Sequence, residues 1–378
     1  MKVLHIIAPV AFGGGESLLL TLINQKCADL DEEVVLLYHA PPFEEALDRN
    51  GIPHHVLRNA SLGHGRPRWA VFLDIVPNLL HLPALIGLIR KKRPDLLHVH
   101  GFPGSLMVAL ASLFLRCPKL YTHHFYRQQP RRFERLVFEC VYSRFDANTA
   151  VSNLAAQSMN QAFPGLKTPF RTVYNAFDPR FASPPPPDRT RWNLPQNVFT
   201  FIQVARFTPF KNHALIIEAV ARLDQTERET LHIVFAGDGP LRGELVRRIE
   251  ELGLVPHFTF LGLVPHETLP SLMACCDAAL FPSDNEGFGI AAVECMACGL
   301  PVLALDNQLM REIIGPGGLL VCRTELHLGL TRMKRECALL KPMALERSAL
   351  FRAPRIKSEY RDIYTRISPG GASGIPQS

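Results

Sequence analysis

Two glutamates and the loop between them could bind a hydroxylated ligand. Glu286 stands in the sequence Asp-Asn-Glu-Gly-Phe-Gly at 284–289, and Glu294 follows within an apolar stretch. A carboxylate can accept hydrogen bonds from a pair of hydroxyls, and such contacts are selective because an unpaired buried hydroxyl is costly. Glu286 could instead be an acid that favours the dipole of a following helix. Glu294 needs a polar partner, because it lies among Ala, Val, Cys and Met.

Cations and backbone amides nearby could hold a diphosphate. Arg206 and Lys211 follow an apolar run at 200–204, where two cations would neutralise phosphate charge without a metal. A solvated charge pair is the alternative interpretation. The segment at 287–289 opens an expected helix, whose free N–H groups favour an anion. The residues concerned are Gly287, Phe288 and Gly289.

Two glycine-rich turns could bring backbone close to the same ligand. Gly237 begins the turn Gly-Asp-Gly-Pro at 237–240, and Gly13 and Gly14 lie in Gly-Gly-Gly-Glu at 13–16. Glycine lets the backbone bend and approach closely. A glycine loop alone is a weak signal, and the second turn does not match the full dinucleotide fingerprint, so NAD binding is not expected.

Alternating strands and helices must position these residues. We expect strands at 3–8, 34–38, 96–100 and 119–123 with a helix at 17–28, then strands at 200–204, 231–236, 258–261, 278–282 and 301–304 with helices at 214–223, 241–252 and 290–298. This alternation predicts an α/β protein with doubly wound parallel sheets. Ligands bind such sheets at the carboxyl ends of the strands, where the cations and Glu286 stand.

The length and a proline run predict two domains. The chain has 378 residues, and single cores seldom exceed roughly 250–300 residues. Four consecutive prolines at 184–187 form a stiff connector. We therefore expect a first domain at 1–180, a linker at 181–189, a second domain at 190–350 and a disordered tail at 368–378.

Taken together, these segments resemble the retaining glycosyltransferases of family 4, which have the GT-B fold. The two glutamates with their flanks carry the resemblance furthest, and supporting segments are Ala-Arg-Phe at 205–207, Lys-Asn at 211–212, Asn-Ala-Phe-Asp at 175–178, Asp-Leu-Leu-His-Val-His at 95–100 and Tyr-Thr-His-His at 121–124. Ala205 and Ala176 stand where the family has glycine. The resemblance implies two Rossmann-like domains facing a central cleft, with a helix at 355–367 crossing back to the first domain.

The resemblance also implies roles for single residues. Glu286 would contact the donor sugar and Glu294 the ribose, while Arg206 and Lys211 would clamp the diphosphate. His124 becomes the candidate active-site histidine, with His100 as second choice; a structural histidine at a strand end is the alternative. The implied catalytic set is His124, Glu286, Arg206 and Lys211, and the implied donor-binding set is Gly13, Gly14, Arg206, Lys211, Gly237, Gly287, Phe288, Gly289 and Glu294.

The expected reaction is transfer of a sugar, with retention, from a nucleotide-diphosphate sugar. The acceptor would be a glycan, a lipid-linked intermediate or a lipopolysaccharide-type molecule in cell-envelope polysaccharide biosynthesis. We expect no cofactor and no metal. Cys295 and Cys298 have the spacing of a redox or metal pair, but we interpret them as small core residues. The alternatives are a GT-B sugar-nucleotide epimerase, a GT-B phosphorylase, and an inactive glycosyltransferase-like partner subunit.

The distribution of charge along the chain suggests what kind of acceptor or surface the protein binds. The net charge of +6 lies in residues 1–175, which hold 19 Lys and Arg against 13 Asp and Glu. A basic half can attract a phosphorylated acceptor or an anionic membrane, or it can simply aid solubility; no nucleic-acid partner is expected. The arginine cluster Arg127, Arg131, Arg132 and Arg135 is either a phosphate site or a solvated helix face.

One apolar segment could touch a membrane. The uncharged stretch at 75–89 is too short to span a bilayer, but basic residues at 90–93 follow it. Such a pair can lie in a membrane interface, or the segment can be a helix packed on its own domain. Nine scattered cysteines and an N-terminus without a signal sequence predict a cytoplasmic protein with reduced thiols. Peripheral contact with the inner face of the plasma membrane is a further possibility.

Overall fold

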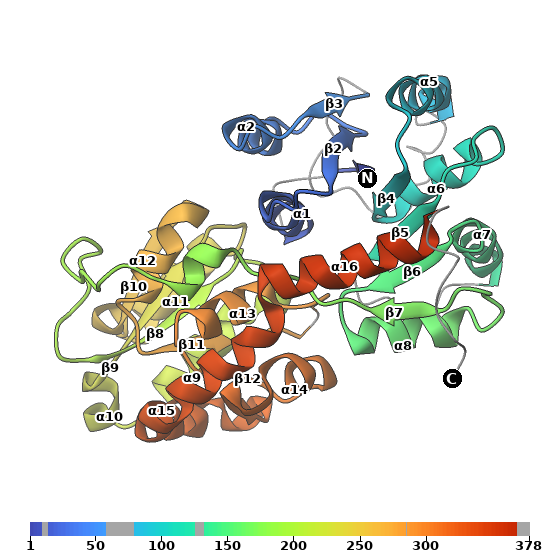
Figure 1. Cartoon of the computed structure of the whole chain (residues 1–378). Coiled ribbons are helices and arrows are strands. Elements are labelled where there is room, and N and C mark those ends of the chain that lie inside the picture. Colours follow the sequence, from blue (N-terminus) through green and yellow to red (C-terminus); the bar gives the residue numbers. More distant parts are fainter. Residues whose placement is uncertain (10–13, 58–78, 125–131, 285, 369–378) are drawn as a thin grey trace. The chain divides into compact units, whose positions relative to one another are not determined.

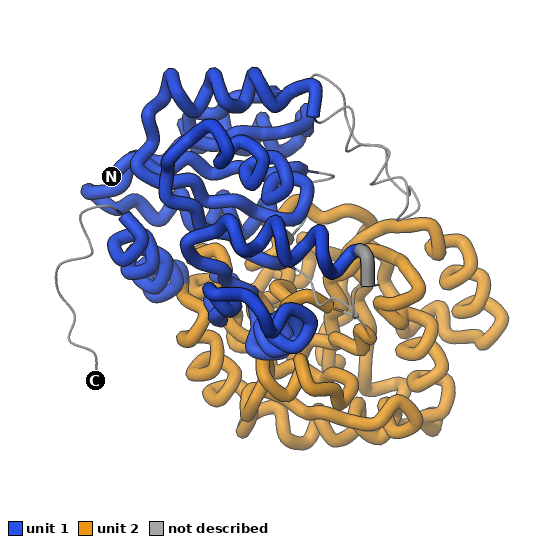
Figure 2. Tube along the Cα trace, turned by 90° about the vertical axis from the view of Figure 1, so that its right-hand side faces the viewer, with its two compact units in different colours: residues 1–176, 353–378 blue, residues 177–352 orange. Residues whose placement is uncertain are grey.

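Two compact units make up the computed structural model, which describes residues 1–9, 14–57, 79–124, 132–284 and 286–368. Unit 1 comprises residues 1–176 and 353–378, and unit 2 comprises residues 177–352 (Figure 2). The division falls between Ala176 and Phe177, so the prolines at 184–187 lie inside unit 2 and do not divide the domains as the sequence predicted. Phe181 explains the shift, because its fully buried side chain ties this segment to unit 2 through His266, with ring centroids 5.1 Å apart.

Unit 1 is built on a seven-stranded parallel sheet in the order β3-β2-β1-β4-β5-β6-β7 (Figure 1). Its strands are β1 (Lys2–Ile7), β2 (Asp31–Leu36), β3 (His54–Val56), β4 (Leu96–His100), β5 (Lys119–His123), β6 (Ala147–Ala150) and β7 (Phe170–Thr172). The reversal of strand order at β1 and β4 is the doubly wound pattern. The expected strands at 96–100 and 119–123 have these bounds, whereas the strands expected at 3–8 and 34–38 begin earlier.

Helices cover both faces of this sheet. They are α1 (Gly14–Asn24), α2 (Pro41–Arg49), α5 (Leu82–Lys92), α6 (Phe102–Ala111), α7 (Arg132–Tyr142), α8 (Asn153–Ala162) and α16 (Ala353–Ile367). The last helix of the chain, α16, belongs to unit 1, where Tyr360 and Tyr364 pack in one cluster with Leu18 and Leu22 of α1. The second face packs α5, α6, α7 and α8 over a larger apolar core.

Unit 2 has a six-stranded parallel sheet in the order β10-β9-β8-β11-β12-β13. Its strands are β8 (Phe199–Val204), β9 (Leu231–Ala236), β10 (Phe258–Gly262), β11 (Ala278–Phe281), β12 (Val302–Leu305) and β13 (Gly318–Val321). Its α-helices are α9 (His213–Ala221), α10 (Gln225–Glu229), α11 (Arg242–Glu251), α12 (Leu269–Met273), α13 (Ile290–Ala297), α14 (Gln308–Ile314) and α15 (Leu326–Ser348). Short 3₁₀ turns connect them, among them η1 (Pro179–Ala182), η2 (Pro209–Lys211) and η4 (His266–Thr268). The α/β class with two doubly wound parallel sheets is thus confirmed.

The segment before α16 is the longest helix of unit 2. α15 runs for 23 residues and contains Pro342, although the sequence pattern assigned no helix there. It approaches the sheet closely at Gly329, where a Cβ atom would lie 2.9 Å from the Leu303 side chain. The buried residues of α15 recur every three or four positions, but the exposed leucines Leu328, Leu339 and Leu345 weaken this periodic signal in the sequence.

The apolar segment proposed for membrane contact falls partly on α5. Residues 75–78 lie outside the described ranges, while Leu85 and Ile89 of α5 are buried in the core of unit 1. Leu80, just before the helix, is 78% exposed, and Arg90 is exposed in its last turn. Within the described ranges, no helix combines the length and apolar character needed to cross a membrane.

Candidate active site

The loop after β8 is shaped by the glycine turn after β9. Phe207 is fully buried, and its N–H donates to the carbonyl of Asp238 at 3.0 Å. A Cβ atom on Gly237, whose φ is +151°, would lie 2.0 Å from the carbonyl oxygen of Ala205. A Cβ on Gly239 would lie 2.5 Å from the carbonyl oxygen of Phe207. The glycines at 237 and 239 are therefore needed for backbone packing that holds exposed Arg206 at the strand end.

Two strand-end loops are tied together around Lys211. Asn212, at φ +55°, donates from Nδ2 to the carbonyl of Pro282 at 2.7 Å and to Asp284 Oδ2 at 2.8 Å. The N–H of Asp284 donates to the carbonyl of Phe210 at 3.0 Å. Arg323 in turn donates to both carboxylate oxygens of Asp284 at 2.6 Å. These bonds join the end of β8 to the end of β11.

Lys211 and Glu286 meet as a result. Lys211 Nζ donates to Glu286 Oε1, and the two side chains are 17% and 14% exposed. The ammonium also lies 5.3 Å and 5.5 Å from the ring centroids of Phe210 and Phe281, within the range of cation–π attraction. The structure thus brings together two residues that the sequence analysis assigned to different parts of a ligand.

The start of α13 presents backbone to the same place. Gly289 precedes the helix with φ +90°, and a Cβ there would press against the Phe281 ring at 3.2 Å. The first N–H groups of a helix lack intrahelical partners and favour an anion. Phe288 is 3% exposed, because its ring packs edge-on against the ring of Phe351, with the two ring centroids 5.6 Å apart. Its side chain belongs to the core, so only its backbone can meet a ligand.

Glu294 has a partner that the sequence analysis missed. The side chain is 6% exposed, and Oε1 lies 2.8 Å from Nε2 of His266, in η4 after β10. Burial alone would lower the pKa of His266, but the hydrogen bond and charge of Glu294, with the nearby Asp178 carboxylate, outweigh burial and raise it. A histidine shortly after an expected strand at 258–261 was the available signal, since loops at strand ends carry sites.

His124 lies in unit 1 directly after β5. Its Nε2 is 3.1 Å from Nδ1 of His100, so the two histidines named from the sequence are hydrogen-bonded to each other. The Nδ1 atom of His124 is buried and has no hydrogen-bond partner among the described residues. Burial lowers the pKa of His124 to about 4, so this imidazole is neutral at pH 7.

The other predicted residues of unit 1 lie partly outside the described ranges. Gly13 lies outside the described residues, and Gly14 begins α1. Of the arginine cluster, Arg127 and Arg131 also lie outside the described residues, while Arg135 is exposed on α7. A phosphate site in this cluster stays a prediction.

Three histidines of unit 1 stand as close as metal ligands do. Ring nitrogens of His5, His98 and His100 lie within 4.8 Å of one another. Each ring already has a hydrogen-bond partner on both nitrogens. His98 contacts the hydroxyls of Tyr364 and Thr122, both at 2.7 Å. His5 and His100 contact each other, and their remaining nitrogens contact Glu32 and His124, respectively. We therefore describe the group as a hydrogen-bonded cluster; the expected absence of a metal stays a prediction.

Protonation of these histidines gives a pH prediction. The pKa of His124 falls from 6.5 to about 4, so its neutral form stabilises the fold fully above pH 6.5, and this contribution is lost as pH falls toward 4. We expect a loss of about 3 kcal/mol in unfolding free energy from His124 over that range. Urea unfolding at pH 7, 6, 5 and 4 measures it. A His124→Asn variant should show a shallower slope, and an unchanged slope would contradict the assignment.

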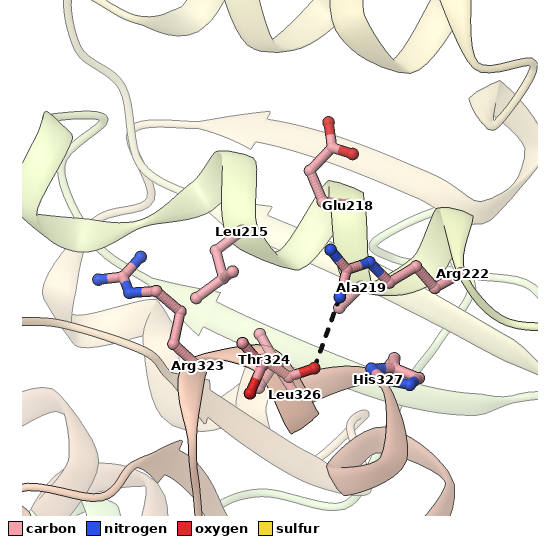
Figure 3. A pocket seen from close by; sticks show the side chains of 8 residues that line it. All are labelled: Leu215, Glu218, Ala219, Arg222, Arg323, Thr324, Leu326 and His327. Atoms are coloured by element: carbon pink, nitrogen blue, oxygen red, sulfur yellow. Dashed lines mark hydrogen bonds between the residues drawn. The ribbon is translucent and has the colours of Figure 1, made fainter.

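A surface pocket of about 210 Å³ lies elsewhere on unit 2 (Figure 3). It is lined by α9 with the following Arg222, by the turn before α15 and by the first residues of α15; Arg222 donates across it to the carbonyl of Thr324 at 3.5 Å. Among the residues of the candidate site, none lines this pocket. Its lining residue Arg323 contacts the candidate site only indirectly, through its hydrogen bonds to Asp284.

Family models match both units. Residues 12–181 match the model described as "Glycosyltransferase Family 4", and residues 186–325 match "Glycosyl transferases group 1". The second match contains Arg206, Lys211, Glu286 and Glu294. The first contains His100 and His124.

Named relatives match over shorter stretches. The 2-deoxystreptamine glucosyltransferase of Streptomyces kanamyceticus is 35% identical over 148 residues, which are 38% of this chain and 38% of the relative. A GDP-mannose-dependent alpha-(1-6)-phosphatidylinositol dimannoside mannosyltransferase of Mycobacterium tuberculosis is 32% identical over 126 residues, or 33% of this chain and 32% of the relative. The matched stretch thus spans less than half of either relative.

Solved structures match over nearly the whole chain. Anabaena HepE, in complex with UDP-glucose, superposes with a TM-score of 0.76 at 23% identity, covering 96% of this chain and 99% of that one. Sucrose-phosphate synthase from Thermosynechococcus elongatus gives a TM-score of 0.78 at 19% identity, covering 97% and 98%. At these identities the likeness concerns the fold.

Proposed function

This chain belongs to the family 4 glycosyltransferases with the GT-B fold, and on that premise we propose that it transfers a sugar from a nucleotide-diphosphate donor. The ion pair of Lys211 with Glu286, beside the start of α13, is the observation that carries the proposal. A cation, a hydroxyl acceptor and free backbone N–H groups together match a sugar attached to a diphosphate. The bound UDP-glucose of the HepE structure supports this class of donor.

Donor binding would exchange the partners of the ion pair. The diphosphate takes Lys211, and a sugar hydroxyl donates to Glu286, so neither charge is left without a partner. Glu294, oriented by His266, accepts from the ribose hydroxyls. Arg206 is exposed at the strand end and adds a second cation to the diphosphate.

The proposed chemistry is transfer with retention. As the bond to the anomeric carbon breaks, negative charge grows on the diphosphate, and Lys211 with Arg206 stabilises it. The sugar passes through an oxocarbenium-like state while an acceptor hydroxyl attacks from the side of the leaving group and gives its proton to the departing diphosphate oxygen. The neutral His124 of unit 1 accepts a hydrogen bond from the transferred sugar. No step uses a metal, so EDTA should leave the rate unchanged.

The acceptor is proposed from the names of relatives and from the distribution of charge. The relative from Mycobacterium tuberculosis is named for a phosphatidylinositol dimannoside, and others are named D-inositol 3-phosphate glycosyltransferase. Those names and the basic character of residues 1–175 support a phosphorylated or lipid-linked glycan acceptor. We propose a role in cell-envelope polysaccharide synthesis, with the protein in the cytoplasm or at the inner face of the plasma membrane.

Product analysis tests the reaction. The purified chain is incubated with UDP-glucose, UDP-N-acetylglucosamine or GDP-mannose and an acceptor panel, and the first product is examined by proton NMR. An α-donor should give an α-linked product. A β-linked product would contradict retention, conversion of the donor to an epimeric nucleotide sugar without acceptor would indicate an epimerase, and a requirement for free phosphate would indicate a phosphorylase. Measurable donor hydrolysis would exclude an inactive partner subunit.

His266 provides a further prediction. Replacing His266 with Ala removes the hydrogen bond that orients Glu294, and a hydrogen bond to a charged group is worth about 1.5–3 kcal/mol. We expect the KM for the donor to rise by roughly ten- to a hundredfold, with a smaller change in kcat. His257→Ala, in the 3₁₀ turn that precedes β10, is the matched control. Equal KM values in the two variants would show that His266 does not act on the donor.

A further inference from the structure

A row of buried polar side chains connects α16 with His124 in unit 1. Glu32 of β2 accepts a hydrogen bond from Lys357 of α16, and its Oε1 lies 3.0 Å from Nε2 of His5. Nδ1 of His5 lies 3.2 Å from Nε2 of His100, whose Nδ1 lies 3.1 Å from Nε2 of His124. All five residues belong to unit 1, and the three histidines come from β1, β4 and the end of β5. We call this row the imidazole chain.

The carboxylate end gives the imidazole chain a direction. Burial would raise the pKa of Glu32, but the hydrogen bonds and charges of His5 and Lys357 outweigh it and lower the pKa, so Glu32 is ionised. An ionised carboxylate can only accept, so His5 must carry its proton on Nε2. Burial also lowers the pKa of His5 and His100, so each ring is neutral and carries one proton.

The remaining proton positions follow one by one. Because His5 is protonated on Nε2, its Nδ1 accepts from Nε2–H of His100. His100 then has an unprotonated Nδ1, which accepts from Nε2–H of His124. His124 is left with an unprotonated Nδ1, and this is the buried atom without a partner among the described residues. The carboxylate of Glu32 thus determines which nitrogen of His124 is free to accept.

A neighbouring branch does not disturb this order. His98, on the same strand as His100, uses Nδ1 with the hydroxyl of Tyr364 and Nε2 with the hydroxyl of Thr122. Its ring centroid lies 4.1 Å from that of His100, with the two rings tilted by 35°, and it makes no hydrogen bond to the imidazole chain among the described residues. Hydroxyl groups can donate or accept, so this branch fits either tautomer and imposes none.

We propose that Glu32, His5 and His100 are positioning residues that hold His124 in the tautomer whose Nδ1 accepts a hydrogen bond from a hydroxyl of the transferred sugar. The sugar contact rests on the proposed function. The tautomer itself follows from the contacts within unit 1. A neutral acceptor fixed in this way would orient a sugar hydroxyl at the reacting end of the donor without adding charge there.

The sharpest test is Glu32→Gln, which keeps the size of the side chain but reverses the direction of the hydrogen bonds along the imidazole chain. The amide oxygen would accept from Lys357, and the amide NH₂ would then donate to His5 Nε2. Each imidazole must shift its proton, which leaves His124 protonated on Nδ1. Glu33→Gln is the matched control, because Glu33 is the next residue on β2 but pairs with Lys2, Lys92 and His55 instead.

Nitrogen NMR of the full chain labelled with ¹⁵N-histidine reports the tautomer without any substrate, with His124→Gln used for assignment. Wild type and Glu33→Gln should show His124 with a proton on Nε2, and Glu32→Gln should show it on Nδ1. A wild-type proton on Nδ1, or no change in Glu32→Gln, would overturn the tautomer assignment.

Kinetics test the sugar contact separately. With UDP-glucose and a responsive acceptor, Glu32→Gln should lower kcat at least about tenfold at little change in the donor KM, and Glu33→Gln should not. A reversed tautomer with unchanged kcat would overturn the sugar contact alone. A wild-type chain that shows the expected tautomer but binds no nucleotide sugar would instead overturn the proposed function.

Discussion

Replacing Lys211 with Ala should lower kcat by roughly two to three orders of magnitude, the cost of losing one preorganised charge-stabilising group. The ammonium is placed by the bonds between the loops after β8 and β11, and it is the less exposed member of the cation pair. Its charge is needed most when the diphosphate departs. Steady-state release of UDP from UDP-glucose, with circular dichroism and thermal unfolding as checks on folding, measures the effect.

The control for Lys211 is another lysine of unit 2. Lys341 is 44% exposed on α15, about 4.0 Å from Asp277, and Lys341→Ala should keep full activity. Lys211→Ala also leaves Glu286 without its cation, so the double variant with Glu286→Gln separates a charge imbalance from lost catalysis. Activity restored by the second change would show that Lys211 serves only to pair Glu286.

Replacing Glu294 with Ala should abolish detectable donor binding under conditions where wild type is saturated. The carboxylate is 6% exposed, is held by His266, and has been assigned to the ribose diol. Removing it leaves buried hydroxyls unpaired, which costs about 1–3 kcal/mol for each group. We therefore expect the donor Kd to rise by roughly a hundredfold or more, as measured by calorimetry with UDP-glucose.

Two variants limit the interpretation of the Glu294 result. Glu294→Gln keeps the acceptor for His266 and should retain part of the affinity. Glu267→Ala changes an exposed acid next to His266 and should leave the affinity unchanged. If Glu294→Ala bound the donor as tightly as Glu267→Ala, the ribose assignment would be wrong.

The class of fold could be predicted from the sequence because buried parallel strands leave clear apolar runs. The strands at 96–100 and 231–236 were expected with the bounds observed. The short strands β3 and β7 were not expected, because three residues carry no usable periodicity. The proline run was a misleading boundary signal, since prolines at 184–187 are also compatible with a surface segment of unit 2.

The residues of the candidate site were named from the sequence, but their pairings were not. The types and flanks of Glu286 and Glu294 pointed to hydroxyl recognition, and the need of Glu294 for a partner was foreseen. That this partner is His266 depends on tertiary packing of η4 against α13, which no local pattern records. The ion pair of Lys211 and Glu286, from loops 75 residues apart, likewise requires the sheet order.

The most direct test of the account is calorimetric titration of the purified chain with UDP-glucose, UDP-N-acetylglucosamine and GDP-mannose, each repeated with Lys211→Ala and Glu294→Ala. We expect saturable binding of at least one of these donors to wild type, weakened strongly in both variants and unchanged in Lys341→Ala. Binding of none of them to the folded wild-type chain, or equal binding to wild type and both variants, would contradict a nucleotide-sugar site in unit 2.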